Sequence, residues 1–173
     1  MTMRRGVLRT MAVAATGIVA VAVSTTPVIA HRSGNGLQTP QLSVYPYNYN
    51  DVWQPAMNKA GSNWNATSTP VRVYKDSDSG STITAKSYSN TWYGTYTRCG
   101  PSCFYIKLNS RTIARDASNT SNFITSVLVH ELGHALNLAH NTVTSIMNRS
   151  RNRNSTTYTK PRPHDVSDVN AYY

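Results

Sequence analysis

The sequence predicts a domain of the α+β class, in which helices precede and follow a group of short strands. Three observations predict it: a helical period over residues 50–65, strand-like stretches between residues 71 and 108, and a second helical period from Thr120. Strands that follow one another without intervening helices are typical of α+β folds. Residues 31–173 are long enough to form one domain with a hydrophobic core.

Residues 1–30 have the pattern of a secretory signal peptide. Three arginines among the first nine residues precede an apolar run over residues 11–23, and small residues then lead to Ala30. A basic segment, a short apolar segment and a small residue before the cleavage point are typical of such peptides. A membrane anchor is the alternative, but a spanning helix needs about 20 apolar residues. We therefore expect cleavage after Ala30, secretion to the extracellular space, and no stable membrane span afterwards.

The first predicted element after the signal peptide is a flexible leader over residues 31–40, which are rich in glycine and polar side chains. An amphipathic helix is predicted over residues 50–65, with Asn50 or Asp51 as its N-cap. Its apolar residues recur at steps of three and four: Val52, Trp53, Ala56, Met57, Ala60 and Trp64.

Four stretches rich in threonine, tyrosine and valine predict strands. They cover residues 71–74, 82–88, 91–97 and 104–108. Between the first two, Asp76 and Asp78 weakly resemble a calcium-binding loop. An ordinary turn is favoured, because calcium prefers several carboxylate oxygens and the carboxylate that would close such a loop is missing.

Cys99 and Cys103 are the two cysteines of the chain. In an exported protein an even number of nearby cysteines predicts a disulfide, and Gly100-Pro101 can turn the chain between them. A metal-binding pair of cysteines is the weaker alternative.

The composition is basic, with 17 lysines and arginines against 7 acidic residues and a net charge of +10. A basic exported protein is attracted to anionic surfaces, so an anionic cell surface is a candidate partner, although simple solubility is the favoured explanation of the charge. No motif of interleaved basic and aromatic residues predicts nucleic-acid binding. We expect a monomer without a nucleic-acid partner.

The helix predicted from Thr120 is apolar nearly all the way round, which predicts that it is buried. It carries His130, Glu131 and His134, and Glu131 is the only glutamate of the chain. Histidines four residues apart lie on one face of a helix and can reach one metal ion. Glu131 lies at the edge of this face, where it can accept a proton from a water that zinc activates.

His140 completes a three-histidine zinc site only if the helix ends before it. A straight helix would place His140 about 9 Å beyond His134 along the axis, too far to share an ion. Asn137 lies between them, and asparagine is the commonest residue after glycine in the left-handed conformation that ends helices. The sequence therefore predicts that the chain turns back at Asn137.

The stretch HELGHALNLAH resembles the metzincin signature H-E-x-x-H-x-x-G-x-x-H, with Asn137 in place of the glycine. Met147 in the sequence SIMN resembles the methionine turn of that group. Core packing is the alternative, but the position of Met147 after His140 favours the turn. The tail PRPHDVSDVNAYY resembles the closing helix of matrixin-like members. The resemblance implies a metzincin-like α+β fold over residues 41–173, with a mixed, twisted sheet above the active-site helix and a small C-terminal subdomain.

The resemblance also implies a secreted zinc-dependent endopeptidase acting on protein or peptide substrates. Zinc would be bound by His130, His134 and His140, with Glu131 as the catalytic base. One alternative is a hydrolase of peptidoglycan or other amides that uses the same zinc site. Another is a non-catalytic surface-binding module stapled by zinc, which Glu131 argues against.

Several other residues are predicted to have no part in this site. His31 and His164 are isolated in the sequence, and we expect neither to bind metal. Arg149, Arg151 and Arg153 are expected to lie in a solvated loop near the cleft.

Overall fold

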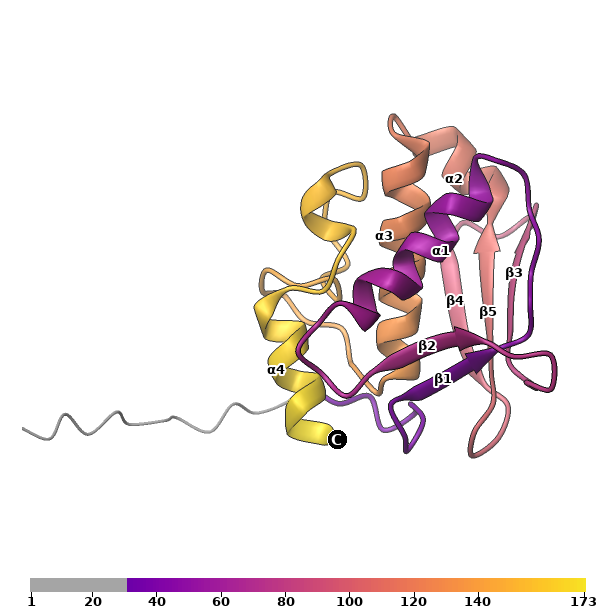
Figure 1. The fold of residues 1–173 in the computed structure, drawn as a ribbon. Coiled ribbons are helices and arrows are strands. Elements are labelled where there is room, and N and C mark those ends of the chain that lie inside the picture. Colours follow the sequence, from indigo (N-terminus) through magenta and orange to yellow (C-terminus); the bar gives the residue numbers. More distant parts are fainter. Residues whose placement is uncertain (1–30) are drawn as a thin grey trace, which may run out of the picture.

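The computed structural model describes residues 31–173, so the predicted signal peptide lies outside the described residues. Strands lie on one side of helix α3, and the C-terminal segment with α4 lies on the other side (Figure 1). No helix in the described part of the chain is long and apolar enough to cross a membrane. The elements are β1 (Gln41–Val44), α1 (Trp53–Asn65), β2 (Arg72–Lys75), β3 (Thr82–Lys86), β4 (Gly94–Arg98), β5 (Phe104–Asn109), α2 (Ser110–Asp116), α3 (Thr120–Ala135), the short 3-10 helix η1 (Thr156–Tyr158) and α4 (Pro163–Tyr172).

The strands form two hydrogen-bonded groups rather than the single mixed sheet that the sequence resemblance implied. β1 pairs in parallel with β2, while β5 pairs in parallel with β3 and antiparallel with β4. One backbone hydrogen bond, from Tyr45 N to Ser81 O at 2.8 Å, connects the end of β1 to the start of β3. Strand β4 is an edge strand of the mixed three-stranded sheet.

The core lies around α3, which packs against α1 and against the inner face of β4 and β5. Its apolar residues are buried all the way round, as the sequence pattern predicted. The indole of Trp64 in α1 is fully buried and donates a hydrogen bond to Val129 O at 3.0 Å. Tight packing on every side fixes the helix that carries His130 and His134.

Three elements, β1, α2 and η1, were not predicted from the sequence. All are short and none has a long periodic pattern. The predicted strand over residues 91–97 begins only at Gly94. The N-cap of α1 is Val52 rather than the predicted Asn50 or Asp51. Asn50 nevertheless contacts the start of the helix, because its Oδ1 accepts hydrogen bonds from the N–H groups of Val52 and Trp53 at 3.1 and 3.0 Å.

The predicted flexible leader instead lies along the end of α3. Two of its N–H groups donate to carbonyls at the end of α3: Ser33 N to Asn137 O and Leu37 N to Ala135 O, both at 2.8 Å. In the opposite direction, Ala139 N donates to His31 O at 2.7 Å. The glycine content of this segment permits close packing, because a Cβ at Gly36 would clash with Asn137. These contacts hold the segment against the turn that follows α3.

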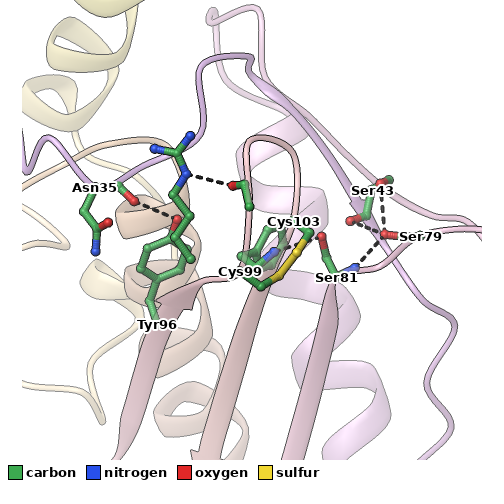
Figure 2. Close-up of a disulfide and its surroundings, with 10 residues drawn as sticks. Asn35, Ser43, Ser79, Ser81, Tyr96, Cys99 and Cys103 are labelled. Carbon is green, nitrogen blue, oxygen red and sulfur yellow. Dashed lines mark hydrogen bonds between the residues drawn. A yellow bond between two sulfur atoms is a disulfide. The ribbon is translucent and has the colours of Figure 1, made fainter.

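The predicted disulfide joins Cys99 and Cys103, whose Cα atoms are 5.2 Å apart at the turn between β4 and β5. Figure 2 shows this bond beside Ser81 at the end of the sheet. The KDSDSGS stretch forms a turn, in which Asp78 N donates to Asp76 Oδ1 at 3.0 Å.

Candidate metal centre

The Nε2 atoms of three histidines converge above α3. The distance from His140 Nε2 is 3.2 Å to His134 Nε2 and 3.2 Å to His130 Nε2. We call His130, His134 and His140 the cleft histidines; each offers one ligand atom, and these atoms lie within 4.8 Å of one another. Nitrogens bound tetrahedrally at about 2.0–2.1 Å from zinc lie about 3.3 Å apart, so the observed spacing fits such an ion.

The chain brings His140 back to the helix by turning at Asn137, as predicted. Asn137 has φ 67° and is the only non-glycine residue with positive φ among the described residues. Leu138 N donates to Gly133 O at 2.9 Å and Asn137 N to His134 O at 3.0 Å. These two bonds form a Schellman motif, which satisfies the last carbonyls of the helix and reverses the chain.

Hydrogen bonds on the opposite ring nitrogens orient two of the three imidazoles. His130 Nδ1 lies 2.8 Å from Ile146 O, and His134 Nδ1 lies 2.9 Å from Leu138 O. A carbonyl only accepts, so each Nδ1 carries the proton and each Nε2 presents its lone pair. Burial lowers the pKa of His130 well below its ordinary value and that of His140 to about 4. The rings are therefore neutral at pH 7, as metal ligands must be.

Glu131 lies beside the cleft histidines and lines the same pocket of about 340 Å³. It is 5% exposed, and no hydrogen bond from a described residue occupies its carboxyl group. Burial raises the pKa of Glu131 to about 8, while the charges of Arg151 and Arg153 act in the opposite direction. A cation at the histidines would also favour the carboxylate form.

Gly94, at the start of β4, allows Glu131 to lie where it does. A Cβ at this position would be 2.8 Å from Glu131 Oε1 and 2.7 Å from Val127 Cγ1, closer than real Cβ contacts. The sequence analysis missed this residue, although a glycine within a strand often marks close approach of another group.

Met147 lies under α3, as the resemblance implied. It is buried, and a Cβ at Gly133 would clash with its sulfur. Asn148 N donates to Ser145 O at 3.3 Å and closes the turn around it. Asp165 of α4 fixes this turn through Ser145 Oγ and through Ile146 N at 3.0 Å.

Arg151 is buried, so the prediction that all three arginines of this loop are solvated is wrong for this residue. It is 5% exposed and donates to Ser126 Oγ, Ser126 O and Asn148 O at 3.2, 3.0 and 3.1 Å. Burial lowers its pKa to about 9. The loop after Met147 is thereby tied to α3, and no sequence signal distinguished Arg151 from the neighbouring Arg149.

The wall of the pocket opposite α3 is the edge strand β4. Gly94, Thr95 and Tyr96 line the pocket together with the cleft histidines and Glu131. An edge strand presents backbone N–H and C=O groups that can pair with an extended chain. The arrangement thus combines three histidines that could hold a metal ion, a buried carboxyl group and the edge strand of a sheet.

Comparison with known proteins agrees with this geometry. The family model described as Matrixin matches residues 46–173. No curated protein matches the chain. A solved structure described as the GM1-bound form of the ECX AB5 holotoxin is similar with a TM-score of 0.53 at 15% identity, over 85% of this chain and 90% of that one. At this identity the likeness concerns the fold alone.

Proposed function

Because this chain belongs to the matrixin family, we propose that it is a secreted zinc-dependent endopeptidase. The observation that carries the proposal is the convergence of three histidine Nε2 atoms beside the buried Glu131 carboxyl. Three histidine ligands with one position left open are typical of catalytic rather than structural zinc sites.

His130, His134 and His140 would hold the zinc ion. Their spacing of 3.2 Å and their orienting hydrogen bonds support this assignment. When bound, zinc supplies Lewis acidity, which polarises a carbonyl group and lowers the pKa of a coordinated water.

Glu131 would act as general base and then as general acid. Its carboxylate accepts a proton from the attacking water, and the resulting carboxylic acid donates that proton to the leaving amine. A buried site suits both steps, because burial brings the pKa of Glu131 closer to neutral pH than that of an exposed glutamate. His130 and His134 cannot take this role, since their Nδ1 atoms donate to backbone carbonyls and their Nε2 atoms would bind the metal.

The substrate would bind as an extended peptide along β4. Main-chain pairing with an edge strand recognises any extended peptide, which suits an endopeptidase. Gly94, at the start of this strand, brings the bound chain close to Glu131.

We further propose that the protein acts outside the cell. The basic and apolar pattern of residues 1–30 supports export. The Cys99–Cys103 disulfide also supports it, because such bonds persist in oxidising compartments.

The test is incubation of the purified protein with a peptide library, with and without a zinc chelator. We expect internal cleavage that the chelator abolishes and added zinc restores. A parallel incubation with peptidoglycan separates the protease from an amide hydrolase of the cell wall. Release of wall fragments without peptide cleavage would overturn the proposal.

A further inference from the structure

A second set of metal-binding side chains lies where the two ends of the described chain meet. His31 comes from the N-terminal segment, and His164 and Asp168 come from α4. We call these three residues the terminal cluster. Figure 1 shows the start of the described chain running beside α4.

The three donor atoms of the terminal cluster form a triangle of the size that one small cation requires. His164 Nε2 is 3.1 Å from His31 Nδ1 and 3.4 Å from Asp168 Oδ2, and His31 Nδ1 is 3.5 Å from Asp168 Oδ2. Ligands of a tetrahedral zinc ion lie about 3.3 Å apart. The triangle thus closely matches that of the cleft histidines.

Asp168 lacks the partners that a buried carboxylate needs. Its side chain is 2% exposed, and its Oδ1 has no hydrogen-bond partner. In the described part of the chain, only His31 and His164 place a basic group within ion-pair distance of it. A buried carboxylate is costly unless a cation neutralises it.

Local geometry holds the cluster in place before any ion binds. His164 and Asp168 are four residues apart on α4 and therefore share one face. The backbone of His31 is fixed by Ala139 N, which donates to His31 O at 2.7 Å, and His31 N donates to Asp168 Oδ2 at 3.3 Å. The two imidazoles are 43% and 26% exposed, so an ion can enter from solvent.

We propose that His31, His164 and Asp168 form a second metal site that binds a divalent transition-metal ion of the zinc or copper type. The donor set of two imidazoles and one carboxylate suits these ions and not calcium or magnesium, which prefer oxygen ligands. Neither the family nor the sequence pattern assigned a metal to these residues. The site does not depend on the proposed peptidase activity.

Cleavage after Ala30 would add a fourth donor. His31 would then begin the chain, and its α-amino group would stand where the peptide nitrogen now lies, 3.3 Å from Asp168 Oδ2. An amino group and Nδ1 of the same histidine can close a chelate ring on one ion. Nitrogen-rich sets of this kind favour Cu²⁺, whereas the three side chains alone suit Zn²⁺.

The experiment counts metal ions in the secreted protein, whose N-terminus is determined by sequencing. The protein carries no affinity tag, because tag histidines bind metal; its basic charge permits purification by cation exchange. After chelation, samples are reloaded with Zn²⁺ or Cu²⁺, separated from free metal and analysed for metal content. We expect about two ions per parent chain and about one in His31→Ala and His164→Ala.

Two controls define the sites. Asn170→Ala, an exposed change on α4, should keep two ions, and His140→Ala should keep only the ion of the terminal cluster. Far-ultraviolet circular dichroism and a urea unfolding transition like those of the parent show that His31→Ala and His164→Ala are folded, whether or not the protein cleaves peptides. In the copper sample, electron paramagnetic resonance should show nitrogen ligands that His31→Ala alters. The same number of ions in the parent, His31→Ala and His164→Ala would overturn the proposal, whether or not the cleft histidines bind metal.

Discussion

The cleft histidines and the terminal cluster present nearly the same triangle of donor atoms but are assembled in different ways. The cleft histidines lie within eleven residues, on one helix and the turn that ends it. The terminal cluster joins residues 133 and 137 positions apart. The same triangle of donor atoms can therefore arise from residues close together in the sequence or from residues that the fold brings together. Only the first arrangement can be recognised as a sequence motif.

The surroundings of the two clusters differ more than their triangles. The cleft histidines open into a pocket that Glu131 and the edge strand β4 also line. In the terminal cluster the one carboxylate, Asp168, is itself a donor of the triangle. We therefore expect metal at the cleft to support hydrolysis, and metal at the terminal cluster to stabilise the join of the N-terminal segment to α4.

The largest effect is expected at Asn137, because this residue forms the turn that places His140 beside His130 and His134. Asn137→Val should lose most zinc at the cleft and most peptide cleavage. A β-branched residue at positive φ costs at least about 1–2 kcal/mol. It also removes the Oδ1 that accepts from Gly36 N and Ser33 Oγ at 3.1 and 3.0 Å. Zinc affinity at the cleft and cleavage rate are the measurements.

Asn137→Gly is the matched control, because glycine accepts positive φ at no steric cost. It loses only the two side-chain hydrogen bonds, worth about 0.5–1.5 kcal/mol each. We expect this variant to keep zinc and activity at moderately reduced stability. Equal zinc loss in both variants would mean that the hydrogen bonds, and not the backbone angle, hold His140.

The parts of the fold and site that the sequence predicted are those set by local periodicity. The four-residue step from His130 to His134, the continuous apolar surface of α3 and the left-handed position of Asn137 each follow from a few neighbouring residues. The disulfide was also predictable, since Cys99 and Cys103 are separated by a short turn.

The parts that escaped prediction depend on contacts between distant segments. His31 and His164 look isolated because nothing near either residue indicates that α4 meets the N-terminal segment. Gly36 suggested flexibility, whereas it permits close packing against Asn137. Arg151 and Arg149 look alike in the sequence, and only the position of Ser126 on α3 distinguishes them.

A substitution at Gly94 tests whether metal binding and catalysis at the cleft can be separated. Gly94→Ala should displace Glu131, because the new Cβ would lie 2.8 Å from Oε1. A displaced general base loses part of the roughly 10²–10⁴-fold that acid–base catalysis contributes, so we expect about a tenfold or greater loss in kcat/KM with zinc content unchanged. Gly80→Ala is the control, since its nearest contact would be an ordinary 3.6 Å to Cys103 Cβ. A Gly94→Ala protein as active as the parent would show that Glu131 tolerates displacement.

Arg151 tests how the loop after the cleft histidines is supported, and we expect the smallest effect here. Arg151→Ala removes three hydrogen bonds, two to Ser126 and one to Asn148 O, which together contribute about 1–3 kcal/mol to the free energy of unfolding. Arg149→Ala should change stability by less than about 0.5 kcal/mol, because Arg149 is exposed. Urea unfolding of both variants is the measurement. Equal stability of the two would contradict the anchoring role of Arg151.

Replacement of Glu131 by glutamine tests the proposed hydrolytic mechanism most directly. Glu131→Gln keeps size but cannot accept the proton, and it leaves the three histidines intact. At matched zinc occupancy, the rate of cleavage of a library-selected peptide should fall by at least about 100-fold. Asp51→Asn, the same change at an exposed carboxylate, should cleave like the parent. A Glu131→Gln enzyme that binds zinc normally and cleaves within a few-fold of the parent rate would contradict the mechanism.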